Sequence, residues 1–399
     1  MAGTSTTMNL TPVLHLVTCG SVDDGKSTLI GRLLAETNSV PIDTLEYARR
    51  TRRGGSTSPV GEIDYSLLTD GLEAEREQGI TIDVAYRHMN LPNGRRVLVA
   101  DSPGHEQYTR NMAVAASNGD VAILMVDAAR GVRAQTHRHL TICALMGVKT
   151  VIVAVNKMDL VGYEHATFEE IVGIVRTTAA RLSVPAVIAI PVSAFTGDNI
   201  TAPSTEMPWY EGPTLLSALE TWEPVQLVGE QPFRFPVQFI VRAEGNFRGY
   251  AGTVVSGRVS KGDAVVIADS GRSAVIDRIV TYDLHVEGHV ADLESAETGQ
   301  AVTITLDHEV DVTRGDVIAG GAGEPLQPAD RFAVDMVWLG EEPLAHGRSY
   351  LLVSGSRSVP ATVTNVRHRL DVVEGHEHAA RILEMNDIGR VEIATDKGH

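Results

Sequence analysis

Eight consecutive residues near the N-terminus have the types and spacing that a nucleotide's phosphates require: Gly20-Ser21-Val22-Asp23-Asp24-Gly25-Lys26-Ser27. They fit the pattern G-x-x-x-x-G-K-[ST] and lie between an apolar strand-like segment and a helical one. The glycines let backbone N–H groups converge on the α- and β-phosphates, and the helix N-terminus adds positive potential. Lys26 is expected to reach the β- and γ-phosphates, and the Ser27 hydroxyl to bind Mg²⁺. We therefore predict a phosphate-binding segment from Gly20 to Thr28.

The alternative for this segment is a glycine-rich turn that binds nothing. A buried Lys26 without an anionic partner would be costly, so this alternative is disfavoured. Within the segment, Asp23 is interpreted as a solvated loop acid, because unpaired acids are common in loops. A role for Asp23 in holding a monovalent cation near the phosphates is the competing interpretation.

A second group of candidate residues follows the apolar segment Arg96 to Ala100 and reads Asp101-Ser102-Pro103-Gly104-His105. The carboxyl end of a strand is where doubly wound sheets place ligand groups. Asp101 could hold Mg²⁺ through a water, and the Gly104 N–H could meet the γ-phosphate. His105 would then lie beside an attacking water. A lone histidine is more often structural, but its position directly after an Asp-x-x-Gly element favours a catalytic, water-positioning role.

A charged segment, Glu75 to Ile82, contains a third candidate Mg²⁺ ligand, Thr81. Its hydroxyl could bind the metal while its backbone meets the γ-phosphate, so the segment would become ordered only with a triphosphate bound. The alternative is a solvated charged loop before a strand.

A further motif predicts which nucleotide base is bound. It is Asn156-Lys157-Met158-Asp159, which directly follows the apolar segment Val151 to Val155. The Asp159 carboxylate can accept from N1–H and the 2-amino group of guanine, whereas adenine would leave the acid unpaired. Lys157 would pack its stem along the base, and Ser193-Ala194 would present a backbone N–H to guanine O6. GTP with Mg²⁺ is the predicted ligand pair. These motifs follow one another in one order along the chain, each at the carboxyl end of a predicted strand, which supports GTP hydrolysis.

These candidate residues must be positioned by a mostly parallel sheet. Short apolar runs alternate with helical patterns from Val13 to about Leu219, and the runs are nearly continuous in Val, Ile, Leu and Ala, as expected for strands covered on both faces. Beyond Phe233 the helical periodicity gives way to alternating segments with glycine-rich turns, which indicates β-barrels. We predict a disordered leader (1–12), a nucleotide-binding α/β domain (13–224), a first β-barrel (230–322) and a second β-barrel (328–399).

The composition limits the other functions. A formal charge of -17 and 43% hydrophobic residues describe an acidic globular protein, and the charge argues against broad nucleic-acid binding. Two cysteines, Cys19 and Cys143, make no disulfide framework and are interpreted as core thiols. So few thiols predict a reducing, cytoplasmic location, and the lack of a signal-like leader or a spanning apolar run predicts no export and no membrane association.

The motifs together resemble the translation-factor GTPases, which implies a P-loop GTPase domain followed by two β-barrels. The segments Asp70 to Tyr86 and Pro103 to Met112 carry the resemblance in addition to the phosphate loop. Ser21, where elongation factors typically have His, and Val84-Ala85-Tyr86 resemble the sulfate-activation branch, the large subunits of sulfate adenylyltransferase. Ser102 stands where that branch usually has Thr. The end of the sequence at His399 suggests that the last barrel is incomplete.

This resemblance implies a division of labour between two subunits. A smaller ATP-binding catalytic subunit would adenylate sulfate, giving adenylyl sulfate and pyrophosphate, and GTP hydrolysis by the present chain would drive that unfavourable step. Two alternatives remain: a GTPase that delivers aminoacyl-tRNA, against which the acidic charge and Ser21 argue, and a GTP-regulated scaffold without useful hydrolysis.

Overall fold

The computed structural model describes residues 13–51, 63–69, 81, 83–224, 231–243, 247–282, 290–320, 326 and 329–396. The predicted leader and the charged segment before Thr81 lie outside these residues, as does Ile82. Among the described residues, no helix combines the length and the apolar character needed to cross a membrane.

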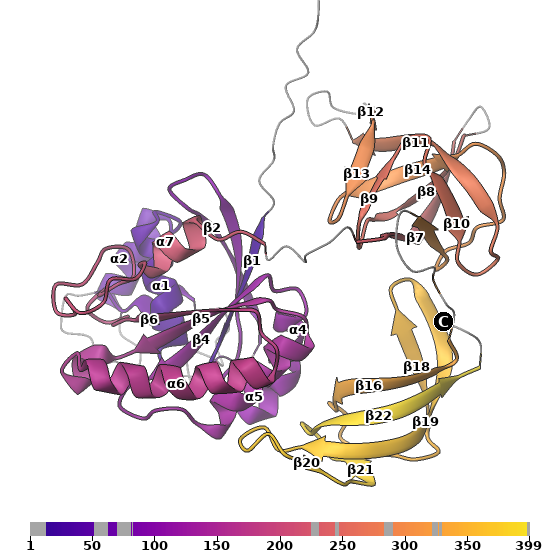
Figure 1. The fold of residues 1–399 in the computed structure, drawn as a ribbon. Helices are drawn as coiled ribbons and strands as arrows, with labels where there is room; N and C mark the ends of the chain where they lie inside the picture. The colour runs from indigo at the N-terminus through magenta and orange to yellow at the C-terminus, as the bar shows by residue number, and fades with distance from the viewer. Residues whose placement is uncertain are drawn as a thin grey trace, which may run out of the picture.

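The N-terminal region is built on a six-stranded sheet in the order β2-β3-β1-β4-β5-β6 (Figure 1). All neighbouring strands are parallel except β2 and β3, which are antiparallel. The prediction of a mostly parallel sheet is confirmed. The strands are β1 (Leu14–Cys19), β2 (Ala85–Asn90), β3 (Arg96–Asp101), β4 (Val121–Asp127), β5 (Thr150–Asn156) and β6 (Ala186–Pro191).

Helices cover both faces of this sheet, and strand β4 shows why. All seven β4 residues are buried, and their side chains alternate between two hydrophobic clusters, because successive side chains point to opposite faces. One cluster contains residues of α4 (Thr109–Ala116), α5 (Ala134–Leu145) and α6 (His165–Arg181), and the other contains residues of α1 (Lys26–Glu36) and α7 (Leu215–Glu220). Helix α2 (Ile42–Arg50) lies further out, beside α1 (Figure 1).

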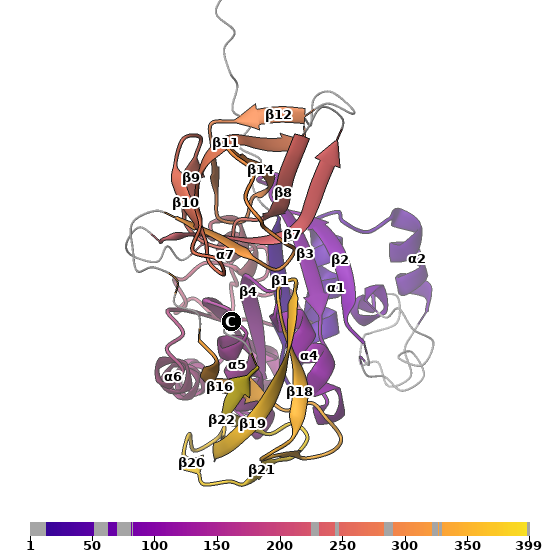
Figure 2. The same cartoon turned by 90° about the vertical axis from the view of Figure 1, so that its right-hand side faces the viewer.

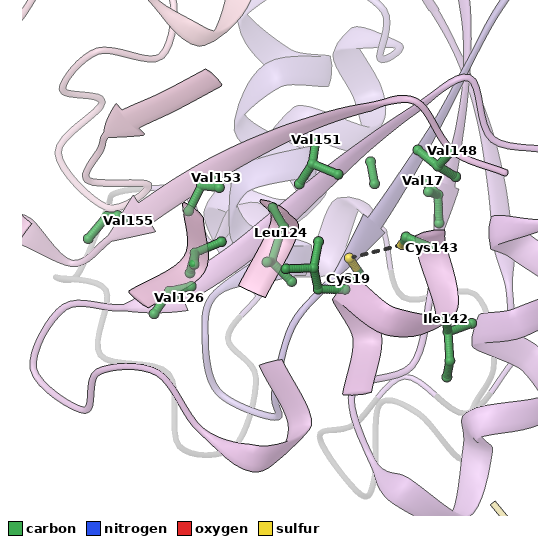
Figure 3. Packing of buried hydrophobic residues seen from close by; sticks show 14 of the residues in the cluster. Val17, Cys19, Leu124, Val126, Ile142, Cys143, Val148, Val151, Val153 and Val155 are labelled. Carbon is green, nitrogen blue, oxygen red and sulfur yellow. Dashed lines mark hydrogen bonds between the residues drawn. The ribbon is translucent and has the colours of Figure 1, made fainter. Parts of the chain in front are cut away.

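The two cysteines lie in the first of these clusters. Cys19 ends β1 and Cys143 belongs to α5, and their sulfurs are 3.9 Å apart among valines of β1, β4 and β5 (Figure 3). Both thiols are free and fully buried, as expected of core thiols.

The middle region is a closed barrel. Six strands pair in the order β10-β15-β7-β8-β14-β11, and β11 pairs back with β10 to close the circle. Strand β12 pairs with β11 in antiparallel orientation, and β9 pairs with β13. The strands are β7 (Phe233–Ala243), β8 (Phe247–Thr253), β9 (Arg258–Ser260), β10 (Ala264–Ile267), β11 (Ser273–Tyr282), β12 (Val290–Leu293), β13 (Ser295–Glu297), β14 (Ala301–Leu306) and β15 (Val317–Gly320).

The C-terminal region is also all-β, but its main sheet is open. The order is β16-β22-β19-β18, and among the described residues β16 and β18 each pair on one side only. The strands are β16 (Arg331–Val337), β17 (Leu344–Ala345), β18 (Ser349–Ser354), β19 (Arg357–Leu370), β20 (Glu377–His378), β21 (Ile382–Leu383) and β22 (Ile388–Thr395).

This open sheet packs against the helices of the N-terminal region. Figure 2 shows β16 and β22 beside α5, and Ile388 of β22 belongs to the same core cluster as residues of α4, α5 and α6. Arg181 of α6 donates to the carbonyls of Glu374 and Val372 at 2.8 and 3.1 Å. The Asn386 side-chain amide donates to the Glu106 carbonyl at 3.2 Å. The C-terminal region therefore contacts the residue directly after His105.

Candidate nucleotide-binding site

The predicted functional segments meet at the carboxyl edge of the N-terminal sheet. Gly20 follows β1, Asp101 is the last residue of β3, Asn156 is the last residue of β5, and Ser193 comes shortly after β6. Because these strands are parallel, their carboxyl ends lie at one edge, where α/β sheets bind ligands.

The phosphate loop is held in place by unusual backbone angles and by Asn156. Gly20 and Gly25 have φ of 145° and 94°. A Cβ on Gly20 would lie 2.8 Å from the Met125 carbonyl oxygen, and one on Gly25 would lie 2.4 Å from Asn156 Nδ2. Asn156 Nδ2 donates to the Asp24 carbonyl at 2.8 Å. Glycine is required at both positions, and the loop is tied to the end of β5.

Lys26 lies over this loop. Its Nζ donates to the carbonyls of Gly20 and Ser21 at 3.0 and 2.8 Å, and the residue is 7% exposed. Burial lowers the pKa of Lys26, while the nearby carboxylates of Asp101 and Asp24 raise it. The positive charge of Lys26 therefore lies at the loop, where a phosphate would be bound.

Asp24 is a buried acid within the phosphate loop. It is 3% exposed, and its Oδ2 accepts from the Ser21 N–H at 2.6 Å. Burial raises the pKa of Asp24 from 3.8 to about 6, and the charges of Lys26 and the Ser21 hydrogen bond only partly oppose that effect. The loop therefore contains a carboxyl group that titrates close to neutral pH.

Two of the three predicted Mg²⁺ ligands are brought together. Asp101 Oδ2 accepts from the Ser27 hydroxyl at 3.3 Å, and Asp101 Oδ1 accepts from the Thr18 hydroxyl at 3.1 Å. A carboxylate beside a hydroxyl supplies the hard oxygen donors that Mg²⁺ prefers, so the residues present fit the metal. Thr81 is half-buried, and its approach to Asp101 stays a prediction.

The segment after Asp101 lies against the phosphate loop. The Ser102 hydroxyl is fully buried and donates to the Thr18 carbonyl, and Pro103 is buried beside it. A Cβ on Gly104 would lie 2.5 Å from Lys26 Nζ and 2.8 Å from the Gly20 carbonyl oxygen. A side chain at position 104 would therefore displace the lysine.

His105 is exposed at the end of this segment. Its Nδ1 accepts from the Gln107 N–H at 3.2 Å, where it caps the short 3-10 helix η2 (Glu106–Tyr108). A neutral His105 in this arrangement carries its proton on Nε2, because Nδ1 must be the acceptor. The ring can then donate a hydrogen bond from Nε2 to a water or an oxygen.

The predicted base-reading residues form a connected group. Asp159 Oδ1 accepts from the Ser193 hydroxyl at 2.7 Å, and Asn156 Oδ1 accepts from the Ala194 N–H at 2.8 Å. Lys157, with φ of 63°, donates from Nζ to Asp127 Oδ2 at 2.7 Å. The Ala194 N–H is thus engaged by Asn156 in this structure, and its predicted bond to guanine O6 remains untested.

Met158 is placed differently from its neighbours. It is fully buried and belongs to the core cluster that contains α5 and α6 residues. Its side chain therefore contributes packing under the turn, and only its backbone remains a candidate for the ligand site.

The structure adds four residues that the sequence motifs did not identify. Asp127 holds Lys157, and Arg130 lies 3.6 Å from the Asp23 carboxylate. His139 of α5 is fully buried, and its Nδ1 accepts from the Gly20 N–H at 2.9 Å. Burial lowers the pKa of His139 to about 3, so it is a neutral acceptor. Arg32 of α1 contacts the loop after Ser193. No spacing rule links these residues to the site.

Comparison with known proteins assigns the family. Residues 11–225 match the family described as Elongation factor Tu GTP binding domain, and residues 331–398 match the one described as GTP-eEF1A C-terminal domain-like. The GTPase-like domain of S. cerevisiae Ski7, whose structure was solved with GTP bound, has the same fold: TM-score 0.50, 16% identity, 97% of this chain and 91% of that chain covered.

Two groups of relatives cover most of this chain. The bifunctional enzyme NodQ of Rhizobium sp. is 49% identical over 96% of this chain and 58% of its own length. Sulfate adenylyltransferase subunit 1 of Citrobacter koseri is 46% identical over 96% of this chain and 79% of its own length. The chain thus spans less than two thirds of the NodQ relatives and most of the subunit 1 relatives. It belongs to the translation-factor GTPases with an elongation factor Tu-type GTP-binding domain, and among them to the family of sulfate adenylyltransferase subunit 1.

Proposed function

We propose that this chain binds GTP with Mg²⁺ and hydrolyses it as the large subunit of a heteromeric sulfate adenylyltransferase. In this proposal a smaller ATP-binding subunit makes adenylyl sulfate and pyrophosphate from ATP and sulfate. The names of its subunit 1 relatives support the assembly. The observation that carries the GTP proposal is the hydrogen-bonded group of Asp159, Ser193 and Asn156 beside the phosphate loop.

Guanine is the base that this group fits. A carboxylate has about four acceptor positions, and the Ser193 hydroxyl uses one on Asp159. N1–H and the 2-amino group of guanine are two adjacent donors that can bond the remaining acceptor positions of the Asp159 carboxylate. Adenine has no such pair, so it would leave a desolvated carboxylate facing a base without donors.

Hydrolysis would depend on charge at the phosphate loop and on a positioned water. Lys26 supplies a positive charge where negative charge develops on the γ-phosphate. His105, with its proton on Nε2, would orient the water by donating a hydrogen bond rather than by removing its proton. Bound Mg²⁺, held by Ser27 and Asp101 with Thr81 as the third predicted ligand, would neutralise phosphate charge.

A route from the site to the rest of the molecule starts beside His105. Asn386 of the open C-terminal sheet donates to the Glu106 carbonyl, and Glu106 forms an ion pair with Arg138 of α5. A rearrangement of residues 101–106 on loss of the γ-phosphate would break or shift these contacts. This supports a role in which hydrolysis changes the arrangement presented to a partner subunit.

The test has two stages. Calorimetry with the purified chain should show binding of GDP and GTP with Mg²⁺ and far weaker binding of ADP and ATP; equal affinities would refute the guanine assignment. Co-purification with an ATP-binding partner from the same cell should then give adenylyl sulfate synthesis that GTP stimulates. If the partner-containing complex makes adenylyl sulfate at the same rate without GTP, the coupling is refuted.

A further inference from the structure

Arg32 of helix α1 connects the phosphate site to the base-reading loop. It lies six residues after Lys26 on the same helix, which is about 9 Å along the axis. Its Nε donates to the Ala194 carbonyl at 2.8 Å, and its Nη2 donates to the Phe195 carbonyl. The Arg32 side chain is 12% exposed; its bond to Ala194 is partly buried, and its bond to Phe195 lies at the surface.

The guanidinium group is held in this position from two further sides. Its Nη1 forms an ion pair with Glu36 at 2.8 Å, and Glu36 also accepts from the Thr201 hydroxyl at 2.6 Å. The Arg32 guanidinium carbon lies 4.5 Å from the centre of the Tyr65 ring. A planar cation with several fixed donors suits such a site, whereas a lysine has a single nitrogen and cannot reproduce the fixed fork that spans the two carbonyls and Glu36 while lying flat over the Tyr65 ring.

The loop itself is shaped to admit this arginine. Gly197 has φ of 99°, and a Cβ on it would lie 2.6 Å from Arg32 Nη1. Gly31, the preceding residue of α1, lets the Tyr65 backbone approach, because a Cβ there would lie 1.9 Å from the Tyr65 carbonyl oxygen. Two glycines thus allow the close contacts on the two sides of Arg32.

We infer that Arg32 is a positioning residue for guanine recognition. It holds the Ala194 and Phe195 carbonyls, and the same loop carries Ser193, whose hydroxyl orients the Asp159 carboxylate. Arg32 therefore sets the position of the base reader relative to Lys26 at the start of the same helix. This inference rests on the proposed function, since it concerns how the guanine of GTP is selected.

The two roles of Arg32, general stability and base selection, predict different results. Damage to the fold as a whole weakens the binding of every nucleotide in the same proportion. Displacement of the Ser193–Phe195 loop weakens guanine nucleotides alone, because ADP depends on the phosphate loop and makes no pair with Asp159. The informative quantity is therefore the ratio of the dissociation constants of ADP and GDP.

The experiment compares Arg32→Ala and Arg32→Lys with the unaltered chain by calorimetry with GDP and ADP in Mg²⁺. We expect the ADP-to-GDP ratio to fall at least about tenfold in Arg32→Ala, through weaker GDP binding at unchanged ADP affinity, and by less in Arg32→Lys. Arg50→Ala, which removes an 81% exposed arginine paired with Glu46 on α2, is the matched control and should leave the ratio unchanged.

Each outcome is decisive. If the unaltered chain shows no preference for GDP, the proposed function fails. If the unaltered chain prefers GDP and both Arg32 variants keep the full ratio, only the inference about Arg32 fails. If Arg32→Ala does not fold, Arg32→Lys, which keeps the charge and the ion pair with Glu36, decides the question by the same ratio.

Discussion

Replacing the buried acid of the phosphate loop, Asp24→Asn, should make the protein more stable at neutral pH. Burial raises the pKa of Asp24 from 3.8 to about 6, although Lys26 and Arg133 oppose the shift; Asp127 adds to it. A difference of about two pKa units corresponds to roughly 3 kcal/mol between the protonation states. Asparagine keeps an acceptor for the Ser21 N–H and cannot ionise, so the cost of burying a charge disappears.

The sign of the effect follows from proton linkage. Below pH 3.8 the carboxyl is protonated in both the folded and the unfolded chain, and Asp24 adds no pH dependence. Between pH 3.8 and about 6 the unfolded chain releases this proton first, so the wild-type protein loses stability as the pH rises. The loss is complete above the folded-state pKa and is absent in the asparagine variant.

The assay is urea unfolding of both proteins at a series of pH values from about 4 to about 8. The free energy of unfolding of the variant minus that of the wild type should increase over this range by roughly 3 kcal/mol and then level off. Asp23→Asn, which removes the adjacent acid with a 65% exposed side chain, is the matched control and should show no comparable increase. A difference that is independent of pH, or that decreases with pH, would refute the reasoning.

Three other substitutions test separate parts of the site. His105→Ala should lower single-turnover GTP hydrolysis by about 100-fold or more while leaving GDP affinity nearly unchanged, because in the proposed function its exposed ring would orient the attacking water; an unchanged rate would contradict this role. Asp159→Asn should weaken GDP and strengthen xanthosine diphosphate, measured by calorimetry, because an amide can donate to the second carbonyl of xanthine; loss of both ligands would indicate a collapsed loop instead. Gly25→Ala should lower the melting temperature and abolish GDP binding, since its Cβ would lie 2.4 Å from Asn156 Nδ2 at a φ of 94°; retained binding would show that the Asn156 link is dispensable.

The sequence was sufficient to predict the parts of the site that depend on local patterns. The run from Gly20 to Ser27 needs only a strand before it and a helix after it, and both are readable from neighbouring residues. The continuous apolar run of β4 likewise predicts a strand that is buried on both faces. Since parallel strands share one carboxyl edge, the convergence of Asp101, Asn156 and Ser193 also followed from the chain order.

Only the tertiary structure decided which distant residues support that site. Arg32 lies 162 positions from Ala194, His139 lies 119 from Gly20, and Asn386 lies 280 from Glu106. Asp24 and Met158 both lie within recognisable motifs, but their burial became known only from the fold. Burial raises the pKa of Asp24 and makes Met158 a core residue. A motif specifies backbone shape and the chemistry of its own residues, whereas burial and pairing depend on segments that meet only when the chain has folded.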